Sequence, residues 1–297
     1  MTSSHTDELL SYMQVHAGAE AQRQSSFIAA YFENTDPDEL AARGPAALYA
    51  IANAHWRLLD APHAAQNAKL RVFNPTLAED GFASEHTVLQ IVHDDMPFLV
   101  DSVTMAVNRS SRTAHWIVHP LMSVVRDAAG RIVSASSVAA ALALGQKNPI
   151  ESLILVECDR IVSEPERQAL AQELGRVLGD VRSAVQDWSA MLERVQSVSD
   201  AAKNSPLPAD SRQEGIEFLH WLQDRHFTFL GARDYDFRRD ADGVSLLACP
   251  DSGLGILRGP AQTLETQLPS GAVALMESNE LVLVTKAMTR ATVHRPA

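Results

Sequence analysis

The stretch "HTVLQIVHDDMPFLVDSV", residues 86–103, joins two elements of different periodicity and decides the fold of the chain. Its first half, up to Val92, is a run of apolar and β-branched residues that is typical of a β-strand. From Phe98 to Asn108 the apolar residues recur at helical spacing. The sequence therefore predicts a strand, a short turn and a helix, and the turn is the first place to look for a site.

This turn has two interpretations. In the first, Asp94 or Asp95 caps the helix by accepting its free amide hydrogens, and Pro97 occupies the first helical turn. In the second, the amides at the helix start hold the carboxylate of a small polar ligand. Capping accounts for every polar group in the turn, so the residues by themselves favour the first interpretation.

The elements around this unit predict an α+β fold. Helical spacing is found over residues 7–32, over 45–59 and over 165–198, and a further helix start follows Asp36, with Pro37 in the first helical position. Strands are predicted over residues 69–75, 86–92, 114–126 and 151–159. Pro120 lies inside the third of these and indicates an edge strand or a bulge, because proline has no amide hydrogen.

The amino-acid composition changes near residue 199. Small, polar and proline residues over 199–213 predict a linker. After it we expect a helix over 212–225, two strands in "HFTFLGARDYDF" and "GVSLLACP", and a last strand in "ELVLVTKA", residues 280–287. Because no terminating element follows "TVHRPA", we expect the chain to be a piece of a longer polypeptide.

Composition excludes several classes of function. The chain has 297 residues, 46% of them hydrophobic, and a net charge of −12, so it can bury substantial cores but lacks the basic runs that bind nucleic acid or an anionic membrane. The longest nearly uncharged stretch is too short to span a bilayer. Only Cys158 and Cys249 are present and no signal peptide is recognisable, which predicts a cytoplasmic protein.

Motifs for catalysis, cofactor binding or metal binding are not recognisable. "GLGILRG", residues 253–259, has the wrong spacing for a dinucleotide loop, and the phosphate-loop, zinc-protease and serine-hydrolase motifs do not occur. His115 and His119 would share a strand face, whereas His86 and His93 would not. We interpret these four as partly exposed sheet histidines rather than metal ligands.

Several separate blocks resemble one family. In order, they are "RVFNPTL", "HTVLQIVHDDMPFLVDSV", "IVHPLMSVVRD", "ESLILVECDR", "LGDVRSAVQDWSAM", "EFLHWLQDRHFTFLGARDY" and "LVLVTKAMTRATVHRP". Together they are similar to the amino-terminal part of the large bacterial NAD-dependent glutamate dehydrogenases. The resemblance implies a helical region over 1–62, an ACT-like domain over 63–198, a linker over 199–211 and an incomplete PAS-like domain over 212–297.

The ACT resemblance implies a ferredoxin-like antiparallel sheet with helices on one face. Such a sheet needs a fourth strand after its second helix, yet helical spacing continues from Leu170 to Val195. We therefore predict a permuted sheet in which residues 69–74 pair with residues 86–92 and fill the fourth position. A partner subunit that fills the same edge is the alternative, and a strand within residues 180–185 would contradict the permuted sheet.

The resemblance also implies a function. It predicts a noncatalytic regulatory and assembly segment, with NAD used elsewhere in the parent enzyme, sister subunits of a homo-oligomer as partners, and no cofactor or metal in this segment. ACT modules hold amino acids near the matching turn, which implies ligand-binding roles for Asp94, Asp95, Met96, Pro97 and Phe98. Two acids there would repel a ligand's carboxylate and favour its ammonium. A free-standing amino-acid-sensing protein of ACT and PAS type is the alternative.

Overall fold

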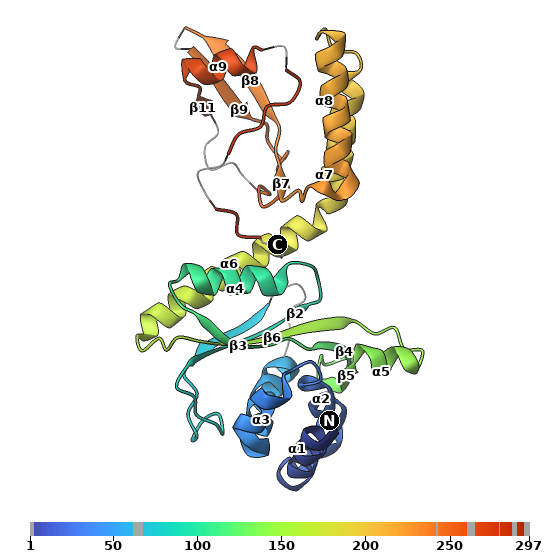
Figure 1. Cartoon of the computed structure of the whole chain (residues 1–297), viewed down its shortest axis with the longest axis vertical. Coiled ribbons are helices and arrows are strands. Elements are labelled where there is room, and N and C mark those ends of the chain that lie inside the picture. The colour runs from blue at the N-terminus through green and yellow to red at the C-terminus, as the bar shows by residue number, and fades with distance from the viewer. Residues whose placement is uncertain are drawn as a thin grey trace. The chain divides into compact units, whose positions relative to one another are not determined.

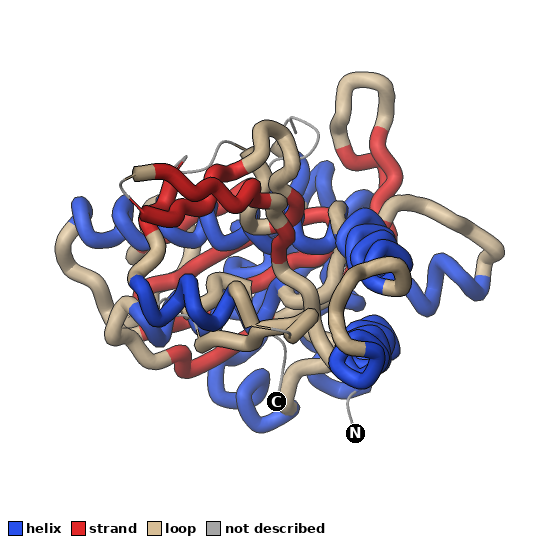
Figure 2. The backbone as a smooth tube through the Cα atoms, turned by 90° about the horizontal axis from the view of Figure 1, so that it is seen from above, coloured by secondary structure: helices blue, strands red, loops and turns tan. Residues whose placement is uncertain are grey.

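The computed structural model describes residues 3–61, 68–241, 243–259, 265–278, 280–286 and 290–293. Contacts within the chain divide it into one compact unit that runs to Leu178 and a second unit over Gly179–Arg295. Helices and antiparallel strands occur in both, which confirms an α+β protein. Figure 2 shows the helices and strands along the chain. Among the described residues, none of the helices combines the length and the hydropathy needed to cross a membrane.

The chain begins with a layer of helices. They are α1 (Ser3–His16), a 3-10 turn (Gly18–Glu20), α2 (Ala21–Tyr31) and α3 (Pro37–Asp60). The single helix predicted over 7–32 is interrupted near Gly18, whose φ of 56° is left-handed. The predicted helix start is confirmed, because the Asp36 side chain accepts from the amide of Asp38 at 2.9 Å. Gly44, with φ 72°, separates the two predicted segments of α3.

A six-stranded antiparallel sheet follows. Its strands are β1 (Lys69–Phe73), β2 (Thr87–Asp94), β3 (Ala114–Val118), β4 (Leu121–Arg126), β5 (Ile132–Ser137) and β6 (Ile150–Cys158). The order is β1-β2-β6-β4-β5, with β3 also paired to β6.

The predicted permuted sheet is confirmed. β1 pairs antiparallel with β2, so that Val72 lies opposite Leu89 and Phe73 opposite Val88. Residues 180–185 are helical, because α6 runs over Glu164–Gln186. The strand that precedes β2 in the chain therefore occupies the position that a fourth strand after the second helix would take.

Pro120 divides the long strand predicted over 114–126 into β3 and β4. Its carbonyl still accepts from the amide of Leu153 at 3.1 Å, so both halves stay on β6. β5 and the helix α5 (Val138–Ala143) were not predicted, because this alanine- and serine-rich stretch has weak periodicity. A turn held by Asp127, whose Oδ1 accepts from the amides of Ala129 and Arg131, sets up the β4–β5 hairpin.

Helices cover both faces of this sheet (Figure 1). α4 (Leu99–Arg109) and the first part of α6 lie on one face, as predicted, and α1–α3 lie on the other. The residues of β2 explain why both faces are covered. Val88 and Val92 point to one face and belong to the core shared with α1–α3. Leu89 and Ile91 point to the other face and are also fully buried. A strand that is apolar on both faces must be covered on both.

The second unit contains the end of α6, four further helical segments and two small sheets among its described residues. These elements are α7 (Trp188–Ala202), α8 (Ala209–Trp221) with a π-helical turn (Leu222–His226), β7 (Gly231–Ala232), β8 (Tyr235–Asp240), β9 (Gly243–Ala248), β10 (Leu254–Gly255), β11 (Glu265–Gln267) and α9 (Ser270–Met276). β10 pairs with β7, and the other sheet has the order β11-β9-β8.

Three predictions for this region need correction. The helix predicted over 165–198 is broken at Asp187, whose carboxylate accepts from the amide of Gly255 at 2.7 Å and pairs with Arg258. The residues of the predicted linker include the end of α7 and the start of α8. In the predicted strand over 280–287, the described residues 280–286 form none, and residue 287 lies outside the described residues. Leu281 instead packs against α8. A Cβ added at Gly215 of α8 would lie only 2.6 Å from the Cβ of Leu281.

A buried histidine joins the helical layer to the sheet. His55 of α3 is fully buried, and its Nε2–H donates to the carbonyl of Ile91 in β2 at 3.1 Å. Its Nδ1 accepts from the hydroxyl of Tyr31 in α2 at 2.7 Å, so the neutral ring uses both nitrogens. Burial lowers the pKa of His55 from 6.5 to about 3, since water cannot solvate its charged form.

We predict an acid sensitivity that originates at His55. Below pH 6.5 the unfolded chain binds a proton at this residue that the folded chain excludes until the pH reaches about 3. Across that window the free energy of unfolding should fall with decreasing pH by about 1.4 kcal/mol per pH unit from this group. Urea unfolding at a series of pH values should show a shallower dependence for His55→Gln than for the native chain. The control His16→Gln alters an exposed histidine, and an equal slope in all three proteins would contradict the assignment.

Candidate functional site

The turn between β2 and α4 has a defined backbone geometry. β2 ends at Asp94, and the amide of Asp95 still donates to the carbonyl of Ile150 at 3.0 Å. Phe98 is left-handed, with φ 75° and ψ −5°, and α4 begins at Leu99. A left-handed conformation is uncommon for a bulky residue, and such residues are concentrated at functional sites.

The predicted cap is wrong in its position. The N-cap of α4 is Phe98, whose side chain has no hydrogen-bond acceptor, and Pro97 precedes the helix instead of lying in its first turn. The physical reason is that the sheet holds the aspartates: Asp94 lies opposite Glu151 in the ladder, and the amide of Asp95 continues the pairing. Both are too far back along the chain to occupy the N-cap position, which Phe98 takes.

His119 and Ser152 form a polar pair that shares its electrostatic environment with this turn. The ring Nε2 of His119 is 2.7 Å from the hydroxyl of Ser152, which is fully buried on β6. Burial lowers the pKa of His119, and the negative charge of Asp95 acts in the opposite direction. The tertiary structure thus places Asp95 within electrostatic range of a residue 24 positions later in the sequence. Pro120 beside His119 predicted only an edge strand or a bulge, so no sequence signal marked this pair.

The other three histidines of the predicted sheet, His86, His93 and His115, occupy two different environments. The rings of His86 and His115 stack with centroids 4.5 Å apart, and the Nε2 of His115 is 2.7 Å from Asp159. His93 is buried rather than partly exposed, and its Nδ1–H donates to the carbonyl of Asp94 at 2.7 Å. No group of three or more potential metal ligands occurs among the residues that the structure describes.

The turn combines groups that suit a zwitterionic ligand. The first amides of α4 have no partner within the helix and lie at the positive end of its dipole, where a carboxylate is favoured. The carboxylate of Asp95 is exposed and offers a counter-charge for an ammonium group. Met96 and Phe98 are half-buried beside these groups.

We predict that the charge of Asp95 controls the protonation of His119. Asp95→Asn removes the negative charge that raises the pKa of His119, so burial should then lower this pKa further. NMR titration of the His119 imidazole would measure the shift. Asp101→Asn, in the first turn of α4, is the control. An unchanged pKa in Asp95→Asn, or an equal fall in both variants, would contradict the predicted contact.

Comparison with known proteins identifies a domain family for the first unit. The model of the family "Glutamate dehydrogenase, ACT1 domain" matches residues 27–174. The match includes β1–β6 and α4, and therefore the turn described above.

Curated relatives extend the similarity along the chain. An NAD-specific glutamate dehydrogenase of Pseudomonas aeruginosa is 32% identical over 98% of this chain, and one of Halomonas elongata is 32% identical over 93%. A third, from Mycobacterium tuberculosis, is 28% identical over 71% of the chain. The chain spans 18%, 17% and 12% of the length of these three relatives, respectively.

Proposed function

Because the chain belongs to the glutamate dehydrogenase family that carries the ACT1 domain, we propose that it is a noncatalytic regulatory and assembly segment of an NAD-dependent glutamate dehydrogenase. The parent reaction would be the oxidative deamination of L-glutamate to 2-oxoglutarate and ammonia, with NAD bound elsewhere in the enzyme. The observation that carries the proposal is the match of residues 27–174 to the ACT1 domain, together with the sheet order β1-β2-β6-β4.

The proposal also divides the chain into domains. In this proposal the helical region over 1–62 would cover the sheet of an ACT-like domain over 63–198, and a PAS-like domain would begin at residue 212. The antiparallel sheet of β8, β9 and β11 supports a second α+β module in this last region. Sister subunits of a homo-oligomer in the cytoplasm would be the partners of this segment.

The proposed effector is a free amino acid at the turn formed by Asp94, Asp95, Met96, Pro97 and Phe98. Its carboxylate would lie at the start of α4, where helix amides and the dipole favour an anion. Its ammonium would pair with the exposed Asp95. This arrangement resolves the repulsion expected from two acids in the turn, because the ligand's two charges meet opposite partners.

The test is an NMR titration of the purified chain with a panel of L-amino acids. We expect one of them to shift the amide signals of residues 95, 96, 98 and 99 saturably and to raise the melting temperature. Asp95→Asn should weaken that binding at least tenfold, whereas Asp127→Asn, in the distant β4–β5 turn, should leave it unchanged. The effector site is wrong if no amino acid shifts these signals.

The noncatalytic assignment has its own test. The purified chain, incubated with L-glutamate and NAD, should produce no NADH, because its sequence has no recognisable phosphate-binding glycine loop. NADH formation that scales with the concentration of the chain would overturn the assignment. Sedimentation equilibrium of the same preparation would test assembly, and a monomer at all concentrations would contradict a self-associating segment.

A further inference from the structure

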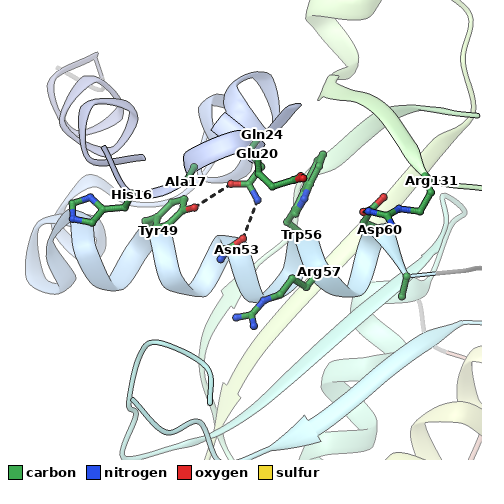
Figure 3. Close-up of a pocket in the computed structure, with 11 residues that line it drawn as sticks. His16, Ala17, Glu20, Gln24, Tyr49, Asn53, Trp56, Arg57, Asp60 and Arg131 are labelled. Carbon is green, nitrogen blue, oxygen red and sulfur yellow. Dashed lines mark hydrogen bonds and ion pairs between the residues drawn. The ribbon is translucent and has the colours of Figure 1, made fainter. Parts of the chain in front are cut away.

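A pocket in the helical layer is distinct from the turn between β2 and α4. It has a volume of about 490 Å³ and lies among the end of α1, the start of α2, the second half of α3 and the β4–β5 turn (Figure 3). This volume is within the range typical of sites for small molecules. The pocket lies in the α1–α3 layer, whereas α4 covers the opposite face of the sheet.

A buried amide holds one wall of this pocket rigid. Gln24 is only 2% exposed, and its Oε1 accepts from the hydroxyl of Tyr49 at 3.2 Å. Its Nε2 donates to the Oδ1 of Asn53 at 2.9 Å (Figure 3). Since the Asn53 oxygen is used in this way, the Asn53 amide is oriented and its Nδ2–H groups have no partner among the described residues. The wall therefore presents a preoriented donor.

Most of the charge around the pocket is neutralised internally. Arg23 pairs with Glu20 at 2.6 Å and with Asp60 at 3.2 Å, and Arg131 pairs with Asp60 at 2.6 Å. Burial raises the pKa of Asp60, but the amide of Ile132 and the two guanidinium groups outweigh burial and hold this pKa below its usual value. These two arginines and two carboxylates sum to zero charge.

Arg57 is the remaining cation among the described residues that line the pocket. It is exposed, forms no ion pair or hydrogen bond through its side chain with the described residues, and lies one helical turn after Asn53 on α3. Its positive charge acts on the hydroxyl of Tyr49, which places it in range of the same wall. Its position in the last turn of α3 also suits the helix dipole, and a test must separate these two roles.

We propose that this pocket binds a small organic carboxylate. The guanidinium of Arg57 would pair with the carboxylate, the geometry for which arginine is suited, and the Nδ2 of Asn53 would donate a further hydrogen bond. The hydrocarbon part of the ligand would lie against the rings of Tyr49 and Trp56, which line the pocket. The chain as a whole is negative, with a net charge of −12. An arginine without an ion-pair partner, next to an oriented amide donor, makes this pocket a local exception that favours an anion.

Isothermal titration of the purified chain with succinate at constant ionic strength tests the proposal, and neutral succinamide is the matched ligand. We expect saturable binding of succinate and none of succinamide. Arg57→Gln should weaken succinate binding at least tenfold. Arg57→Lys keeps the positive charge at the helix end but loses the planar fork, so it should bind with intermediate affinity. The control Arg112→Ala alters another arginine of the same unit and should bind as the native chain does.

Two outcomes would overturn this site. Succinate that gives only heats of dilution would do so, as would Arg57→Gln binding with native affinity while its melting temperature stays unchanged. The NMR signals of the native chain separate this site from the proposed effector site. Succinate should shift the side-chain amide of Asn53 and leave residues 95–99 unmoved, and the reverse pattern would assign the binding to the turn instead.

Discussion

β2 and β6 are buried on both faces, and the rest of the first unit depends on this constraint. Parallel strands are usually the ones covered on both sides, whereas antiparallel sheets commonly leave one face in water. Here α4 and the first part of α6 cover one face and the α1–α3 layer covers the other (Figure 1). β1 protects one flank of β2, and β6 pairs with the other. The central position of β2 thus accounts for the helical layer and for the permuted order of the strands.

Polar contacts fix the orientation of the helical layer. Arg126 pairs with Glu151 and donates to the carbonyl of Leu59 at 3.1 Å, and the same carbonyl accepts from the Nζ of Lys69 at 2.7 Å. These cations satisfy carbonyls at the end of α3, where the helix dipole is negative. Burial, and then the nearby Arg126, lower the pKa of Lys69 to about 8. Together with His55, these contacts set how α3 lies on the sheet, and therefore the shape of the pocket along α3.

The two proposed sites belong to elements that share one strand. The effector turn begins where β2 ends, and the pocket is built along α3, whose His55 donates to the Ile91 carbonyl of β2. A regulatory segment needs ligand sites on elements that pack against one another, because coupling between sites is a difference in free energy between alternative arrangements. The hydrogen bond between His55 and Ile91, together with the one that Gln90 donates to the carbonyl of Ile51, links these two elements directly. The pKa of His55, which burial lowers to about 3, makes the first of them sensitive to acid.

Residue patterns were enough to predict four features: the apolar strand β2, the amphipathic helix α4, the Asp36 cap and the strand β1. Four other features follow from tertiary contacts and had no pattern in the residues: the N-cap at Phe98, the pair of His119 and Ser152, the β5 hairpin, and the absence of a strand over the described residues 280–286. The pocket beside Arg57 also had no sequence signal. The physical reason is that periodicity reports burial along one segment, whereas caps, strand partners and pockets depend on groups that are distant in the chain.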